Sequence, residues 1–220
     1  MPKPARSGTT RDRLIAAAAA EFATRGFDGA KVDRIATRAR INKAMLYYHF
    51  DGKAALYREI LREMFDAVGA SVAEVRQAGA SPEDQIRSFI RAVAREALTR
   101  PNFPAIWLRE IAEGGRHIDA SIAVLMRRIL DTLIEILAEG RAAGVFVEAH
   151  PLVTQMSIVA PLLLFAASAP LRERFGHLVP ALATKPSIGE LIHHVEVTTL
   201  ALLTGAAPGR SSAPHRRGRS

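Results

Sequence analysis

Residues 26–53 read GFDGAKVDRIATRARINKAMLYYHFDGK, and this stretch decides the fold. Its apolar residues recur at spacings of three and four, which predicts two short helices, over residues 32–39 and 43–49. Only Arg40, Ile41 and Asn42 separate the two helices, and two short helices on such a turn form a helix-turn-helix.

The rest of the chain shows the same helical spacing and almost no two-residue alternation, so an all-α fold is predicted. We expect an N-terminal helix-turn-helix domain over residues 1–52 that includes a basic arm, a helical domain over 53–205 and a disordered basic tail over 206–220. Capping residues and Gly or Pro breaks place the other helices. They are expected from Thr9 or Thr10 to Gly26, at Lys53–Ala78 with Asp51 as its cap, and at Pro82–Thr99, Pro104–Glu113, Asp119–Ala143, Leu152–Ser168 and Ile188–Thr204.

The positive charge lies at the two ends of the chain. Residues 1–50 hold ten Lys or Arg against four Asp or Glu, and the tail from Arg210 adds four arginines, whereas the residues between are close to neutral. A nucleic-acid-binding N-terminal domain would produce such a distribution.

The composition limits the classes of protein that the chain can belong to. An apolar fraction of 49% with 24% charged residues is that of a globular protein, and the lack of cysteine excludes disulfides and cysteine-ligated zinc. The most apolar segment, residues 158–167, is too short to span a bilayer, and no apolar stretch of a signal peptide follows the first residues. We therefore expect a cytoplasmic protein with no membrane partner.

Residues 26–53 resemble the DNA-binding signature of the TetR/AcrR family. The similarity covers roughly residues 10–57 and joins Gly26-Phe27, Ile35-Ala36, the Leu46-Tyr47-Tyr48-His49-Phe50 core and Lys53 in a fixed order. The resemblance implies a one-component transcription repressor that binds operator DNA as a homodimer and senses a small molecule with its C-terminal helices.

The second helix of the motif is expected to enter the major groove. Leu46 and Phe50 form its anchoring face and Asn42 caps it. Lys43, Ala44 and Met45 in the first turn are expected to meet base edges, while Tyr47, Tyr48, His49, Lys53 and Lys31 are expected at phosphates.

Four residues depart from the pattern of the family. Ala30 and Lys31 stand where Ser or Thr usually caps the first helix of the motif, and Met45 replaces a common Thr. Arg40 stands where Gly is usual, so a left-handed conformation there would cost about 1 kcal/mol. Because of these departures, the operator sequences of the family cannot be transferred to this chain.

Two apolar stripes near the C-terminus are expected to form a four-helix dimer interface, as in proteins that the chain resembles. A purely intramolecular core is the alternative. The stripes consist of Leu152, Met156, Val159 and Leu163, and of Ile188, Leu191, Ile192, Val195, Thr199 and Leu202.

The central helices carry aromatic and apolar residues that could line a cavity for a small, largely apolar effector. Each residue singly is also compatible with plain core. The candidates are Phe65, Phe89, Phe103, Trp107, His117 and Met126.

Two other classes of protein are alternatives. A regulator without a small-molecule ligand remains open. An all-α enzyme is disfavoured, because the sequence contains no phosphate loop, nucleophile elbow or acid–base constellation, and no cofactor is expected. His193 and His194 are adjacent and point to different sides of a helix, unlike metal ligands four residues apart, so no metal site is expected.

Overall fold

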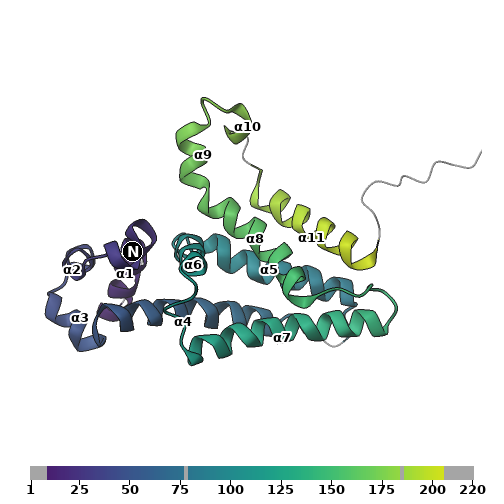
Figure 1. Cartoon of the computed structure of the whole chain (residues 1–220), viewed down its shortest axis with the longest axis horizontal. Coiled ribbons are helices and arrows are strands. Elements are labelled where there is room, and N and C mark those ends of the chain that lie inside the picture. The colour runs from purple at the N-terminus through teal and green to yellow at the C-terminus, as the bar shows by residue number, and fades with distance from the viewer. Residues whose placement is uncertain (1–8, 77–78, 184–185, 206–220) are drawn as a thin grey trace, which may run out of the picture.

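The computed structural model describes residues 9–76, 79–183 and 186–205. Within these residues every regular element is a helix, which confirms the all-α prediction (Figure 1). The predicted basic arm and basic tail lie largely outside the described residues. The helices are α1 Thr10–Gly29, α2 Val32–Ala39, α3 Lys43–His49, α4 Gly52–Ala73, α5 Pro82–Thr99, α6 Phe103–Ala112, α7 Ala120–Ala142, α8 Pro151–Ala167, α9 Ala169–Phe175, α10 Pro180–Ala183 and α11 Ile188–Thr204.

Helices α1–α3 form a small unit at one end of the molecule, which we call the head (Figure 1). Thr9 begins α1 with a capping box, since its hydroxyl accepts from the Asp12 amide while the Asp12 carboxylate accepts from the Thr9 amide. Gly26 adopts φ 69° and bends the last turn of α1. The two helices of the predicted helix-turn-helix have the expected bounds, 32–39 and 43–49.

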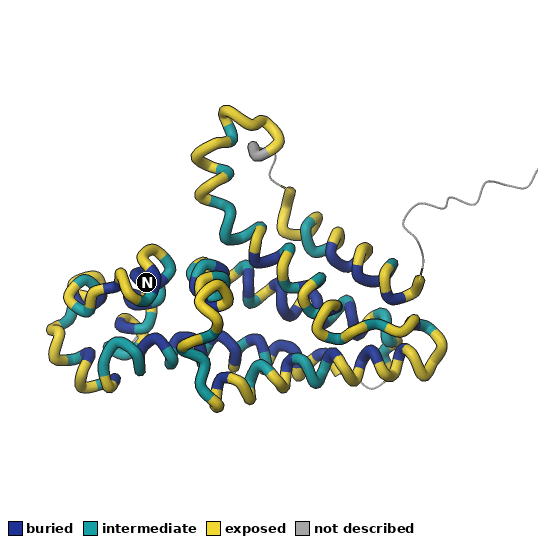
Figure 2. The backbone as a smooth tube through the Cα atoms, in the orientation of Figure 1, coloured by how far each residue is buried: buried dark blue, intermediate teal, exposed yellow. Residues whose placement is uncertain are grey.

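Helices α4–α8 and α11 form the body. Long helix α4 leaves the head and packs against α5 and α7, while α8 and α11 cover α5 from the other side (Figure 1). Figure 2 shows the buried residues concentrated where these helices face one another. The core runs continuously from Leu14 and Phe22 in the head to Phe89 and Leu133 in the body, so head and body are packed together.

Three details of the predicted helices are wrong. Helix α4 ends at Ala73 rather than near Ala78. Within the described residues the Asp51 side chain makes no capping hydrogen bond to α4. Helices α9 and α10 are absent from the prediction, because Pro170 and Pro180 are typical of breaks, although proline is well accommodated in the first turn of a helix.

Helices α9 and α10 stand away from the body as an arm (Figure 1). Helix α9 packs against α8 and α10, and the arm exposes Leu171, Phe175, Leu178 and Val179. Helices as short as α9 and α10 have little stability of their own in water and need apolar contacts to stay folded.

The described helices differ in how far their length and hydropathy suit a membrane span. No single described helix is both long and apolar enough to cross a membrane. Helices α8 and α9 reach that length and hydropathy only together, and they are bent by 47° relative to each other.

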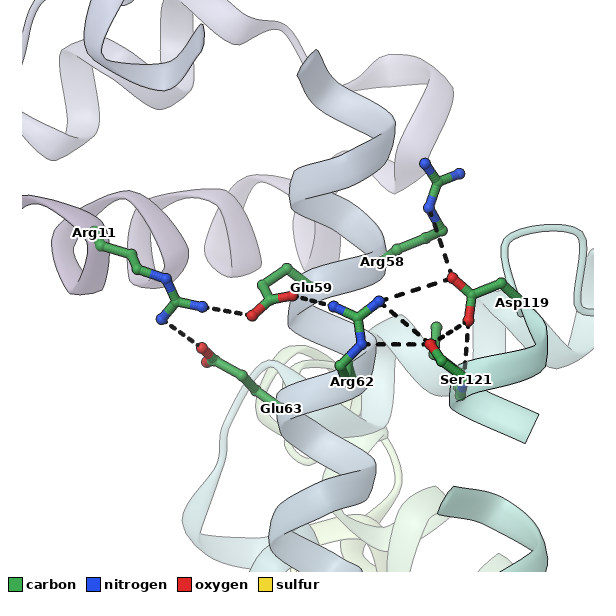
Figure 3. Close-up of polar contacts among 8 residues, drawn as sticks. Arg11, Arg58, Glu59, Arg62, Glu63, Asp119 and Ser121 are labelled. Atoms are coloured by element: carbon green, nitrogen blue, oxygen red, sulfur yellow. Dashed lines mark hydrogen bonds and ion pairs between the residues drawn. The ribbon is translucent and has the colours of Figure 1, made fainter. Parts of the chain in front are cut away.

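Two sets of polar and aromatic contacts join the head to the body. In the first, Arg11 of α1 pairs with Glu59 and Glu63 of α4, and Arg62 of α4 pairs with Glu59 and approaches Asp119 at the start of α7 (Figure 3). The Arg11 distances are 2.5 Å to Glu59 and 2.9 Å to Glu63. This network links α1 to α7 through α4.

The second set lies at the end of α1. The Phe27 ring packs on the His117 ring with centroids 4.2 Å apart, and Asp28 pairs with Arg116 at 2.7 Å. Behind them Glu110, fully buried in α6, accepts hydrogen bonds from the Tyr57 hydroxyl and the His117 amide. The loop after α6 therefore contacts the head through Arg116 and His117, and Glu110 of α6 holds His117 in place.

Candidate functional site

Helix α3 has one face exposed to solvent, and its opposite face packs into the core of the head. Leu46 is fully buried and Phe50 nearly so, whereas Tyr47 and Tyr48 are 55% and 79% exposed. The Asn42 side chain accepts a hydrogen bond of 2.9 Å from the Ala44 amide, which confirms the predicted cap. Lys43 and Ala44 are exposed and Met45 is half-buried, so the first turn of α3 is open to a partner.

The turn before α3 contains Arg40 in a left-handed backbone conformation, which is strained for a residue other than glycine. Arg40 lies in the left-handed region, at φ 54° and ψ 49°, and its amide donates to the carbonyl of Thr37. Such a residue ends α2 and turns the chain toward α3. The chain thus tolerates an arginine where glycine would be unstrained.

Lys43 is held by an acidic residue of α2. Its Nζ lies 2.8 Å from Oδ1 of Asp33, and both side chains are exposed. The hydrogen bond from Lys43 to Asp33, supported by their opposite charges, raises the pKa of the lysine. Asp33 was not among the predicted site residues, since ten positions and a turn separate it from Lys43.

The three other basic residues predicted to contact DNA differ in their surroundings. Lys31 is exposed at the start of α2 and makes no side-chain cap there within the described structure. The His49 ring is half-buried, and its Nε2 has no hydrogen-bond partner among the described residues. Lys53 donates from Nζ to the carbonyls of Phe27 at 2.9 Å and Ala30 at 3.2 Å and lies over the Phe27 ring.

The placement of Lys53 differs from the expected phosphate contact. Its ammonium group satisfies carbonyls at the C-terminal end of α1, where a cation is favourable. We therefore assign Lys53 a structural role, in which it joins the start of α4 to the end of α1.

A small cavity of about 80 Å³ lies between α4, α5, α6, α7 and α8. Four of the predicted effector residues line it, namely Phe65, Phe103, Trp107 and Met126. The Phe65 and Trp107 rings meet edge to face, with centroids 4.9 Å apart. Gln155, Val159 and Leu163 of α8 complete the lining of the cavity.

Two predicted effector residues lie elsewhere. Phe89 is fully buried and is not part of the cavity wall, so it belongs to the core. His117 is at the junction of head and body, where its Nδ1 lies 3.0 Å from Oε2 of Glu110. The sequence could not separate these roles, because aromatic residues on helix faces fill cores and line cavities alike.

One group among the described residues has the composition of a metal site, formed by Glu110, Glu113 and His117. Glu110 already accepts hydrogen bonds from Tyr57 and from His117, and Glu113 pairs with Arg116 at 2.8 Å. The polar groups are thus paired with one another, and this arrangement joins helices without requiring an ion.

The predicted dimer residues fall into two sets. Leu152, Met156, Ile188 and Leu202 are exposed, and Leu191 and Ile192 are half-buried. Exposed Val153 joins them and lines, with Leu202, a groove of about 220 Å³ between α8 and α11.

The other four residues face the interior to differing degrees. Leu163, Val195 and Thr199 are buried within the chain and cannot contact a partner in this conformation. Val159 is half-buried and lines the cavity, as Leu163 does. The stripe on α8 is continuous, but the helix crosses the body, so only the N-terminal half of this face stays open.

Comparison with known proteins places both parts of the chain in one family. Residues 14–60 match the bacterial regulatory proteins of the tetR family, and residues 79–162 match the C-terminal domain described as tetracyclin repressor-like.

The chain is similar to two curated regulators. It is 29% identical over 139 residues to the HTH-type transcriptional repressor NicS of Pseudomonas putida, which covers 62% of this chain and 66% of NicS. It is 41% identical over 56 residues to IcaR of Staphylococcus aureus, a negative transcriptional regulator of the biofilm operon icaADBC, which covers 26% of this chain and 30% of IcaR. The matches thus span just under two thirds of NicS and under one third of IcaR.

The fold also matches solved structures. The TetR family transcriptional regulator PfmR of Thermus thermophilus superposes with a TM-score of 0.68 at 22% identity, over 92% of this chain and 100% of that chain. The matched families consist of regulatory proteins, in agreement with the expectation that the chain is not an enzyme. With its helix-turn-helix head, its helical body and both matched domains, the chain belongs to the TetR family of bacterial regulatory proteins.

Proposed function

We propose that this chain is a transcriptional regulator that binds double-stranded operator DNA through α3 and acts as a repressor. The observation that carries the proposal is the exposed face of α3, on which Lys43, Tyr47 and Tyr48 protrude above buried Leu46. Such a helix can lie in the major groove, with its first turn at base edges and its tyrosines at phosphates. The similarity to the repressors NicS and IcaR supports the negative sign of regulation.

The residues in the proposed DNA interface follow from this placement. Lys43, Ala44 and Met45 read bases, while Lys31, Tyr47, Tyr48 and His49 contact the backbone. Asn42 positions the first turn of α3 through its cap. In this proposal the head, residues 1–52, is the DNA-binding domain and residues 53–205 are the sensor and dimerisation domain.

The proposed regulator acts as a homodimer. The exposed apolar side chains of α8 and α11, among them Met156 and Leu202, form a face that a second copy can cover. A two-fold dimer places two α3 helices about 34 Å apart, in successive major grooves, and therefore requires a palindromic operator.

The cavity in the body is the proposed effector site. Its wall includes Phe103 and Trp107 of α6, and the same helix carries Glu110, which holds His117 beneath Phe27 of the head. An effector that moves α6 therefore changes the support of α1. DNA is released if the effector binds more tightly to a conformation whose heads do not match the operator spacing.

The test is DNA binding by the purified chain to the region upstream of its own gene and to a random-sequence library, over a range of salt concentrations. Selective binding by a dimer, weakened at least tenfold by Tyr47→Ala, is the expected result. Val124→Ala is a control, because it also truncates an exposed side chain but on α7, away from α3. Failure to select any sequence from the library would overturn the proposal.

A regulator without a small-molecule ligand is the second candidate, and the small size of the cavity favours it. In that case DNA binding is unaffected by every compound that enters the body. Release of DNA by a compound bound in the cavity would exclude this candidate.

A further inference from the structure

The chemistry of the cavity restricts what it can hold. None of the described residues that line it is ionisable, and most are aliphatic or aromatic. A charged molecule would lose its hydration there without gaining a counter-ion, which is costly in an apolar site. The cavity therefore selects against carboxylates, phosphates and ammonium groups.

Gln155 of α8 supplies an amide to this wall. The residue is half-buried, the other lining residues are apolar or aromatic, and among the described residues its side chain has no hydrogen-bond partner. An amide can both donate and accept, so it can pair with a hydroxyl or a carbonyl group. Trp107, which lines the same cavity, is the other lining residue whose side chain carries an N–H group.

The size of the cavity limits the length of the ligand. At about 80 Å³ it is smaller than the engineered apolar cavities of about 150 Å³ that bind benzene. Its inner wall is buried, at Phe65, Phe103 and Leu163, whereas Trp107, Met126 and Gln155 are only half-buried. The outer wall is thus the side that can yield to admit one ring.

We propose that the cavity binds a small, uncharged molecule of one ring that carries a single hydroxyl or carbonyl group, and that Gln155 pairs with this group. The inference rests on the proposed effector function and adds the chemical class of the effector. Gln155 acts as the specificity-determining residue, since an amide buried against a ligand without a polar group is left unpaired.

Trp107 provides a direct readout, because it is the single tryptophan of the chain and lines the cavity. Three alicyclic probes do not absorb where tryptophan is excited: cyclohexanol, cyclohexane and cyclohexanecarboxylate. We expect saturable changes in Trp107 emission with cyclohexanol, binding of cyclohexane that is roughly five- to tenfold weaker, and binding of the carboxylate that is weaker still.

Two variants complete the experiment. Gln155→Leu keeps the size of the side chain and is expected to abolish the preference for cyclohexanol over cyclohexane. Val159→Phe fills the cavity and is expected to eliminate the response to both, while the circular dichroism spectrum shows that each variant is folded.

Three results would overturn the proposal: carboxylate binding equal to that of the alcohol, an unchanged preference in Gln155→Leu, or no saturable response to any probe. Failure of this ligand proposal can be distinguished from failure of the proposed regulatory function, because DNA binding and the effect of Tyr47→Ala are measured without any probe. If cyclohexanol binds as expected but leaves DNA binding unchanged, the ligand class stands and the release mechanism fails.

Discussion

The Nζ atom of Lys43, at the first position of α3, lies 2.8 Å from Oδ1 of Asp33 in α2. A residue proposed to read bases is thus held by an acidic side chain of the neighbouring helix. Asp33 is highly exposed, so its charge also faces whatever approaches the head. This pair is expected to act on sequence preference more than on stability, since exposed ion pairs stabilise proteins little.

Replacing Asp33 by Asn is therefore expected to raise affinity for random DNA several-fold and to lower the ratio of operator to random-DNA affinity. Lys43 becomes free to pair with any phosphate, and a repulsive charge is removed. The slope of log affinity against log salt should steepen by about one unit. Asp66→Asn, an exposed acid on α4, is the matched control. An unchanged affinity ratio in Asp33→Asn would contradict this role.

The exposed face of α8 and α11 predicts that Met156→Glu and Leu202→Glu convert the proposed dimer into monomers. Both side chains are exposed in the single chain, at 59% and 64%, so a charge should leave the fold intact while it disfavours burial between two copies. Sedimentation equilibrium measures the outcome. Val124→Glu, at an exposed position on α7 rather than on α8 or α11, should remain dimeric. Dimers in all three variants would place the interface elsewhere.

The sequence predicted the head well because its determinants are local. Asn42 as a cap, Arg40 in the turn and the spacing of Leu46 and Phe50 are all set within a few residues of one another. The sequence did not predict the ion pair between Lys43 and Asp33, because this pair depends on how α2 and α3 pack across the turn.

The body was harder to predict, because periodicity shows which residues share a face of a helix but not what covers that face. Leu163 continues the stripe of Leu152 and Met156, yet Leu163 is buried and lines the cavity. The sequence did not predict that Gln155 lines the cavity, because a polar residue next to an apolar stripe is usually exposed to solvent. Apolar Leu171 and Phe175, which flank charged residues beyond Pro170, could have indicated α9.

Gly140 of α7 is expected to tolerate no side chain. Its carbonyl accepts hydrogen bonds from the amides of Val145 and Phe146, and a Cβ at this position would collide with the buried Phe146 ring. Gly140→Ala should therefore lower the free energy of unfolding by about 1–3 kcal/mol.

The matched control is Gly69→Ala in α4, where the nearest side-chain atom, Cγ1 of Ile129, would lie 4.0 Å from the new Cβ. That substitution should stabilise the chain by about 0.5–1 kcal/mol, because alanine favours a helix interior over glycine. Urea unfolding compares the two. Equal effects would show that Phe146 does not pack on α7 as observed.

Glu21 gives the head a predicted sensitivity to acid. Burial of the carboxylate raises its pKa, but the hydrogen bond and charge of Arg34, at 2.5 Å, outweigh burial and bring the pKa below the ordinary value of 4.5. The folded state then binds fewer protons than the unfolded state in acid. The contribution of this pair is complete above the unfolded pKa and is lost as the pH falls through the folded pKa.

Glu21→Gln is expected to lower the free energy of unfolding by about 1 kcal/mol at neutral pH, since hydrogen bonds to charged groups are stronger than neutral ones. The difference from the original chain should shrink as the pH falls from 7 through the lowered pKa of Glu21, below which Glu21 itself becomes neutral. Urea unfolding at a series of pH values measures it. Glu74→Gln, at an exposed position after α4, serves as the control and should show a small difference at every pH. A difference for Glu21→Gln that stays constant with pH would mean that the charge of Glu21 does not stabilise the contact between α1 and α2.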